Sequence, residues 1–308
     1  MTSETWHIPV MPAETLEWLV TDSDGVYIDA TLGAGGHSAL LLQQLGSGAQ
    51  VFGIDQDDEA LAETARRIDD ERLKTVKGNF GFIATLMHPG LHGKISGILF
   101  DYGVSSHQID APERGFTFRE DGPLDMRMGN LSSLTARDVV NTYPFERLRN
   151  LLFEYGEERR SSAIARQITE SRPLESTADL RKCVEAVIRG PHLVKSLARV
   201  FQAIRIEVNR ELEMLRNGLD QSLKLLKPGG RIVTIAYHSL EDRLVKNFFR
   251  TGNFGGKQEK DFYGNIIRPL QPLHNRPVTA GDAEIQLNPR ARSARLRAAE
   301  KNTEEVPK

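Results

Sequence analysis

The residues best suited to bind a ligand lie between positions 27 and 38, where an apolar run ends in Asp29 and a glycine cluster follows. This pattern predicts a strand, a tight turn and a helix start, an arrangement that holds adenosine-containing cofactors. A dinucleotide fingerprint requires glycine at its first, third and sixth positions. Gly33 and Gly35 fit, but the sixth position is Ser38. Asp29 would also repel a pyrophosphate, so the pattern favours S-adenosylmethionine, which lacks phosphate and carries a positive sulfur.

Three later residues are placed to complete such a cofactor site. Asp55 lies 22 positions after Gly33, the separation at which an acid binds ribose hydroxyls, and capping the next helix is its alternative role. Phe80 follows the third predicted strand, where an adenine ring is expected, although an isolated aromatic residue is equally consistent with the core. Asp101 ends the fourth predicted strand, so we expect it to face the same crevice as the glycine loop, and a structural turn is the alternative.

The elements that position these residues alternate along the first third of the chain. Strand-like runs occupy residues 26–30, 51–54, 73–76 and 95–100, and helical spacing occupies the intervening segments 38–45 and 58–68. Strands that alternate with helices predict βαβ units and a parallel sheet.

The alternation stops at about residue 109 and resumes near residue 200. We predict a helix start at 176–179, one long helix over 196–226, a further strand over 231–237 and a helix over 240–249. The prediction is an α/β, Rossmann-like fold in which residues 1–109 and 200–308 form one discontinuous domain. Residues 110–199 form a helical insertion, and residues 251–276 are expected to be loop and hairpin.

Composition limits the class of protein. The 308 residues are 39% hydrophobic and 27% charged, with a formal net charge of −2, which is typical of globular proteins. No apolar run approaches the roughly 18 residues of a membrane span, and the first residues lack a secretory pattern, so we expect a cytoplasmic protein. The single cysteine, Cys183, excludes an internal disulfide. We expect no metal site, because Pro89 and Gly90 interrupt the helical spacing of His88 and His92.

Positive charge is concentrated near the end of the chain. Residues 290–297 contain Arg290, Arg292, Arg295 and Arg297 and no acid. This segment predicts either a solvated tail or a strip that contacts phosphates.

Longer motifs spread over nearly the whole chain resemble those of the bacterial 16S ribosomal RNA cytosine-N4 methyltransferase family, the MraW type. In chain order the matching segments are residues 7–10, 33–37, 101–106, 108–110, 114–118, 122–128, 155–159, 199–211, 238–243 and 290–294. Two positions depart from the family's pattern: Tyr102 stands where an aliphatic residue is expected, and Ala236–Tyr237 replaces a common Ser–Phe pair.

The resemblance implies a class I S-adenosylmethionine-dependent methyltransferase sheet with an inserted helical domain that recognises the substrate. It further implies that the substrate is a cytidine in the decoding region of 16S rRNA, in the small ribosomal subunit. The cofactor-binding residues it implies are Gly35, Gly36, His37, Asp55, Phe80, Asp101 and Gln108.

Methylation of an exocyclic cytosine amine requires accurate positioning and a proton acceptor, because the amine lone pair is delocalised into the ring. We expect the acceptor in the loop 101–106. The Asp101 carboxylate is one candidate. If Asp101 instead orients the cofactor, Ser105, Ser106 or a backbone carbonyl takes its place.

An extruded base is held by stacking, edge contacts and phosphate contacts. The candidate substrate-binding residues are Tyr102, Arg114, Arg127 and His238. Core packing is the alternative for Tyr102, ion pairs with nearby acids for the two arginines, and a structural role for His238.

Three other functions remain open: a nicotinamide oxidoreductase, a non-catalytic RNA-binding or assembly factor, and a methyltransferase that acts on DNA or protein. Against the oxidoreductase stand Ser38 and Asp29, and against the assembly factor the intact glycine loop with Asp101. The oligomeric state is also open, with a homodimer as one alternative.

Overall fold

The computed structural model describes residues 9–129, 132–264 and 266–303, so His7 and Ile8 of the first motif lie outside the described residues. Its contacts divide the chain into two compact units, Met1–Gly103 with Leu212–Lys308, and Val104–Glu211. The second unit interrupts the first in the sequence, and its bounds are wider than the insertion expected at 110–199. In the described part of the chain, no helix is both long and apolar enough to cross a membrane.

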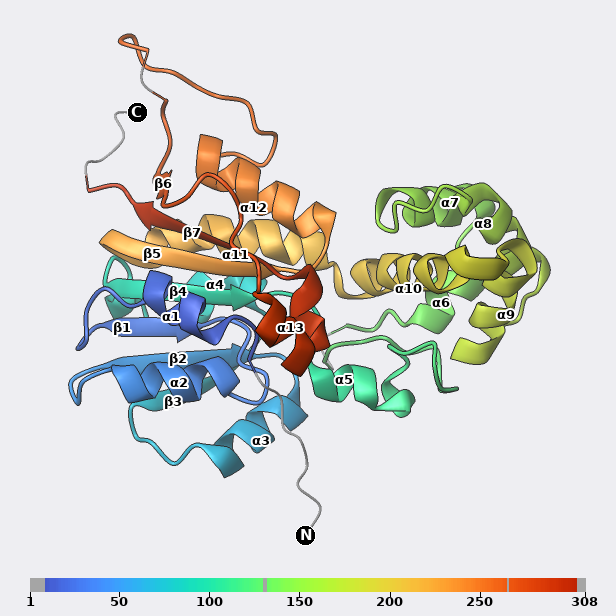
Figure 1. The fold of residues 1–308 in the computed structure, drawn as a ribbon, viewed down its shortest axis with the longest axis horizontal. Coiled ribbons are helices and arrows are strands. Elements are labelled where there is room, and N and C mark those ends of the chain that lie inside the picture. The colour runs from blue at the N-terminus through green and yellow to red at the C-terminus, as the bar shows by residue number, and fades with distance from the viewer. Residues whose placement is uncertain (1–8, 130–131, 265, 304–308) are drawn as a thin grey trace. The chain divides into compact units, whose positions relative to one another are not determined.

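The first unit contains one sheet with the strand order β3-β2-β1-β4-β5-β7-β6 (Figure 1). The strands are β1 (Val26–Asp29), β2 (Gln50–Asp55), β3 (Leu73–Lys77), β4 (Ile95–Asp101), β5 (Leu226–Ala236), β6 (Leu270–Pro272) and β7 (Arg295–Lys301). The pairs among β1 to β5 are parallel, whereas β7 runs antiparallel to both β5 and β6. This order with one reversed strand is that of class I methyltransferases, and the predicted Rossmann-like α/β fold is confirmed.

Helices pack on both faces of this sheet. They are α1 (Pro12–Leu19), α2 (Gly36–Gln44), α3 (Asp58–Arg67), α4 (Ile83–Leu86), α11 (Glu211–Leu225), α12 (Ser239–Thr251) and α13 (Asp282–Leu287). Apolar side chains of α1 and α2 share one core cluster with Leu99 of β4. Successive strand residues point to opposite faces, and Phe100 lies against Gly218 of α11. Strand β4, whose residues 95–100 are all buried, is therefore covered on both sides, as a central parallel strand requires.

Strand β7 corrects the interpretation of the arginine-rich segment. Residues 295–301 form a strand between β5 and β6, so a solvated tail is wrong for this stretch. Arg297 is buried, and its guanidinium donates to Asp242 of α12 at 2.7 Å; Arg295 contacts the same carboxylate at 3.2 Å. These two arginines hold α12 to β7.

The second unit consists of helices around a separate apolar core. Its helices are α5 (Ser106–Asp110), α6 (Ala136–Thr142), α7 (Phe145–Glu154), α8 (Ser161–Glu170), α9 (Thr177–Val187) and α10 (Leu193–Asn209). The predicted helix start at 176–179 is confirmed, because Ser176 and Asp179 form a reciprocal capping box.

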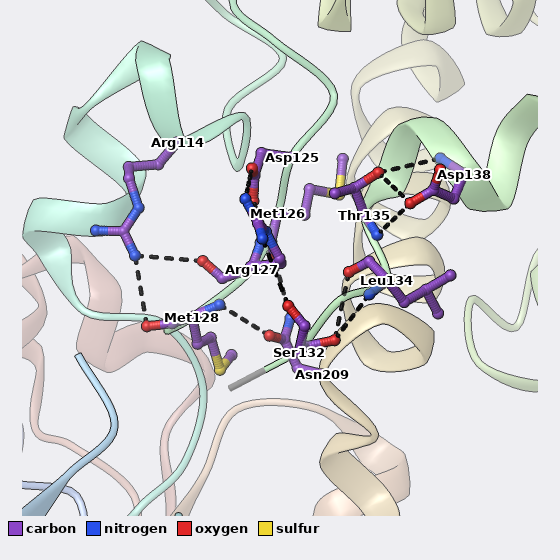
Figure 2. Close-up of polar contacts among 10 residues, drawn as sticks. All are labelled: Arg114, Asp125, Met126, Arg127, Met128, Ser132, Leu134, Thr135, Asp138 and Asn209. Carbon is purple, nitrogen blue, oxygen red and sulfur yellow. Dashed lines mark hydrogen bonds and ion pairs between the residues drawn. The ribbon is translucent and has the colours of Figure 1, made fainter. Parts of the chain in front are cut away.

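The single helix expected over 196–226 is wrong. It divides into α10 and α11 at Arg210, whose φ of 51° lies in the left-handed region. The preceding Asn209 bonds a distant segment: its side chain donates to the Met126 carbonyl at 2.8 Å and accepts from the Met128 amide at 2.8 Å (Figure 2). Apolar spacing continues through the break, so only these tertiary contacts mark it.

Candidate active site

The glycine loop between β1 and α2 has the conformation that its sequence predicts. Gly33 and Gly35 have φ values of 52° and 77°, which side chains rarely tolerate. The Gly33 amide donates to Asp55 Oδ2 at 2.8 Å, and its carbonyl accepts from Thr64 Oγ1 at 2.9 Å. A Cβ at Gly33 would meet no atom within 4 Å, whereas one at Gly35 would lie 2.7 Å from Ile68 Cδ1. Gly33 thus leaves open space beside the loop, and Gly35 permits close packing against α3.

Asp29 and Ser38 explain why the dinucleotide fingerprint is broken. The Ser38 hydroxyl, fully buried on α2, donates to Asp29 Oδ2 at 2.7 Å. Burial raises the pKa of Asp29, while His37 and the bond from Ser38 lower it. Serine at the sixth position therefore satisfies a buried carboxylate, a task that glycine could not perform.

Asp55 is bound to the glycine loop and does not cap α3. Its Oδ1 accepts from the Asp57 amide at 2.9 Å, and Asp57 itself caps the helix by accepting from Glu59. The capping alternative for Asp55 is therefore wrong. Burial raises the pKa of Asp55 to about 6, against the two backbone hydrogen bonds that lower it. Each carboxylate oxygen retains a lone pair, which leaves capacity for ribose hydroxyls.

Asp101 lies at the end of β4 beside the first turn of α2. Its amide donates to Thr31 Oγ1 at 2.7 Å, and its Oδ1 accepts from the Tyr237 hydroxyl at 2.7 Å. Oδ2 is 3.5 Å from His37 Nε2. Burial and the Asp101 charge raise the pKa of Tyr237 well above its usual value, so the phenol stays protonated and donates. Neither His37 ring nitrogen has a hydrogen-bond partner within the described part of the chain.

Phe80 and Tyr102 pack together on Phe100. Phe80 is half-buried, and its ring centroid lies 5.7 Å from that of Phe100 in an edge contact. Tyr102 is 4% exposed and stacks on Phe100 at 5.6 Å. Its hydroxyl has no partner in the described residues, and burial raises its pKa well above the usual value. The Tyr102 ring thus belongs to the core, which was the alternative to base stacking.

His238 begins α12 as its N-cap. Its side chain accepts from the Glu241 amide, and its Nε2 lies 3.1 Å from the Glu241 carboxylate. The helix cap accounts for Nδ1, which matches the structural alternative for His238, whereas Nε2 is buried without a hydrogen-bond partner among the described residues. The exposed His88 and His92 make local bonds, to the Gly90 amide and the Ala84 carbonyl.

Ser105, Ser106 and Gln108 belong to the second unit. Ser105 and Gln108 form a reciprocal capping box at the start of α5, in which Ser105 Oγ accepts from the Gln108 amide at 3.2 Å. The Gln108 side chain also donates to the Met128 carbonyl at 3.2 Å. Ser106 is the first residue of α5, and its side chain lies outside the described part.

Arg114 and Arg127 make internal contacts within the second unit (Figure 2). Arg127 forms a bidentate pair with Asp125, at 2.9 and 2.7 Å, which is the ion pair expected as its alternative. Arg114 donates to the carbonyls of Arg127 and Met128 at 3.2 and 3.4 Å. Both side chains support the 125–128 segment, and phosphate binding by either stays a prediction.

Three contributors to this site were not among the residues predicted for it. Thr64 holds the glycine loop from α3, and Thr31 holds the Asp101 amide. The Tyr237 hydroxyl also binds Asp101. Only a phenylalanine-to-tyrosine departure from the family's pattern pointed to this added hydroxyl.

The first-unit residues fit S-adenosylmethionine. Open space lies beside Gly33, Asp55 offers acceptors for hydroxyl groups, and the Asp101 carboxylate suits a positively charged partner. The unpartnered His37 nitrogens supply further polar atoms next to Asp101.

Comparison with known proteins agrees with a site for S-adenosylmethionine. A profile of the MraW methylase family matches residues 4–302. The chain belongs to the MraW methylase family. Membership confirms the family resemblance, the methyltransferase activity and S-adenosylmethionine as the methyl donor.

Relatives match over almost their full length. A protein of Parabacteroides distasonis is 44% identical over 300 residues, which cover 96% of this chain and 97% of the relative. One of Flavobacterium johnsoniae is 45% identical over 305 residues, covering 97% and 99%. Both are named ribosomal RNA small subunit methyltransferase H. A solved rRNA methylase from Streptococcus thermophilus is 14% identical, with a TM-score of 0.40 over 94% of this chain and 93% of that one.

Proposed function

We propose that this methylase transfers a methyl group to the N4 amine of a cytidine in the decoding region of 16S rRNA. The observation that supports a ribosomal RNA substrate is the identity of 44–45%, over nearly the full length, to relatives named ribosomal RNA small subunit methyltransferase H. Cytosine N4 and the decoding region rest on the family resemblance of the motifs. The small ribosomal subunit is the proposed partner, and the cytoplasm the proposed location.

The glycine loop and Asp55 hold the cofactor in this proposal. Asp55 accepts the ribose hydroxyls, Gly33 allows close approach of the backbone, and Phe80 borders the adenine. S-adenosylmethionine supplies an electrophilic methyl group when bound. Gln108 and His37 are further proposed contacts of the cofactor.

Asp101 is the proposed proton acceptor for the reacting amine. Its Oδ1 is fixed by the Tyr237 hydroxyl at 2.7 Å, which sets the orientation of the carboxylate and leaves Oδ2 toward His37. The Ser105 hydroxyl already accepts a helix-capping bond, which disfavours it as the acceptor. A carboxylate that accepts a hydrogen bond from the amine would orient its lone pair and receive the proton as the new bond forms.

Replacing Asp101 with asparagine tests this role, because the amide keeps the size of the carboxylate but cannot take a proton. We expect cofactor affinity to fall about 10-fold, because the amide no longer attracts the positive sulfur, and the single-turnover rate at saturating cofactor to fall about 100- to 10,000-fold. The assay uses small subunits from cells that lack this chain, with mass spectrometry of the methylated nucleoside. Asp69→Asn, the same change at an exposed acid, is the control.

Two results would redirect the proposal. A D101N variant with weak cofactor binding but a normal rate at saturation would make Asp101 a cofactor ligand only. A product other than N4-methylcytidine would refute the assigned substrate. Tyr237→Phe removes only the hydroxyl on Oδ1 and should lower the rate about 10- to 150-fold, in line with the loss of one hydrogen bond to a charged group.

A further inference from the structure

Two aromatic side chains are almost completely exposed on the segment between α12 and β6. Phe262 is 97% exposed and Tyr263 is 86% exposed, and their ring centroids lie 5.7 Å apart at 88°. Figure 1 shows this segment, orange, reaching out beyond α12. We call its described residues, 252–264 and 266–269, the arm. Two neighbouring exposed rings of this size are unusual on a surface that has no partner.

The base of the arm is fixed to α12. Asn253 makes two bonds with one residue, donating to the Lys257 carbonyl at 2.6 Å and accepting from the Lys257 amide at 3.1 Å. The Phe254 ring stacks on Phe248 of α12 at 4.7 Å, and the Phe254 carbonyl accepts from Asn247 at 3.0 Å. The arm therefore starts from a packed and hydrogen-bonded position.

The tip of the arm is a defined turn. Lys260 and Ile266 form an antiparallel bridge, and the Ile267 amide donates to the Glu259 carbonyl at 2.8 Å. Between them, the Tyr263 amide donates to Asp261 Oδ1 at 2.9 Å, and Gly264 has a φ of 89°. These bonds involve the backbone and Asp261, so the two rings are not needed to close the turn. They are left free to contact a partner.

Charge around the rings favours a polyanion. Residues 250–268 contain the cations Arg250, Lys257, Lys260 and Arg268 and the acids Glu259 and Asp261. One of the two acids is engaged in the turn, and both lysines are exposed. Exposed rings beside lysines are the combination with which proteins bind single-stranded nucleic acid, because any base can stack and any phosphate can pair.

We propose that Phe262 and Tyr263 stack on unpaired bases of the RNA substrate while Lys257 and Lys260 contact its phosphates. The inference rests on the proposed ribosomal RNA substrate and adds a second contact surface for it. Loss of one stacked ring weakens binding by about 5- to 150-fold. The sequence hid this surface, because the segment reads only as a glycine- and asparagine-rich loop.

Two double variants of the full chain separate stacking from general apolar contact. F262W/Y263W keeps flat rings and should bind small subunits within about 3-fold of wild type, whereas F262L/Y263L keeps apolar bulk without rings and should bind at least about 10-fold more weakly. Phe82→Leu, at a 49% exposed ring elsewhere in the first unit, is the matched control and should bind as wild type. Affinity for S-adenosylmethionine should not change in any variant.

Ultraviolet cross-linking of wild type to the same subunits identifies the partner. A nucleotide adduct on the peptide with residues 262–263 is the expected result. Equal binding by the leucine variant, or a cross-link to a ribosomal protein or to a second copy of this chain, overturns the proposal. Failure of the proposed function looks different, because wild type itself would then neither bind nor methylate small subunits.

Discussion

Asp55 should make the protein less stable as pH rises through the acid range. Burial raises its pKa from 3.8 to about 6 in the folded state, so ionisation at neutral pH disfavours folding. A shift of this size corresponds to about 3 kcal/mol. The folded state binds more protons than the unfolded state between these two pKa values, so unfolding free energy falls as pH rises through the window and is level above it.

The variant Asp55→Asn removes this titration. Asparagine loses one of the two acceptors for the Gly33 and Asp57 amides, a cost that does not depend on pH. The difference in unfolding free energy between wild type and variant should therefore shift by about 2 kcal/mol against wild type between pH 4.5 and 7. Urea unfolding at several pH values measures this difference, and parallel profiles for the two proteins would refute the reasoning.

The ionisation of Asp55 should also affect the affinity for the cofactor. Ribose hydroxyls donate to the ionised form, so wild-type affinity for S-adenosylmethionine should weaken below pH 6 by up to about tenfold per pH unit. The variant should bind more weakly at neutral pH, and its affinity should lack this dependence. Calorimetric titration of wild type and of Asp55→Asn with the cofactor at pH 5, 6 and 7.5 measures this difference in pH dependence.

Two further predictions concern stability. Gly35→Ala should lower the free energy of unfolding by about 2 kcal/mol or more, because the new methyl group combines a left-handed backbone with a close contact to Ile68. Gly33→Ala should lower it by only about 1 kcal/mol, yet should weaken cofactor binding, because its methyl group would enter the open space beside the loop. Equal losses of stability for the two variants in urea unfolding would contradict this geometry. Asp242→Ala leaves the Arg297 charge buried without its partner and should lower the free energy of unfolding by about 3–5 kcal/mol. The control, Asp58→Ala, removes an exposed pair with Lys77 and should lower it by less than about 1 kcal/mol. Thermal and urea unfolding of both variants measure the difference.

The sequence was most informative where local patterns decide structure. The strand-like runs at 26–30, 51–54, 73–76 and 95–100 each became a strand of the sheet. The run at 95–100 is continuously buried, as a central strand covered on both faces requires, whereas β3 lies at the edge of the sheet and is partly exposed. Glycines at 33 and 35 marked left-handed positions, and the loop they form does contact Asp55 across 22 positions.

Tertiary contacts decided what local patterns could not. The apolar spacing of residues 196–226 continues through Arg210, and the break there coincides with bonds from Asn209 to a segment some 80 positions away, at 126–128. The arginines at 295 and 297 look like a phosphate-binding strip in isolation, but a strand places them on Asp242.

The sequence by itself determined the parallel strands β1 to β5, the cofactor loop and the family, because these depend on residue types at short, fixed spacings. Only the tertiary structure decided that a hydroxyl at 237 binds the carboxylate at 101, that Ser38 satisfies Asp29, and that two rings at 262 and 263 remain uncovered. The physical reason is that hydrogen-bond geometry and exposure depend on which distant segments pack together.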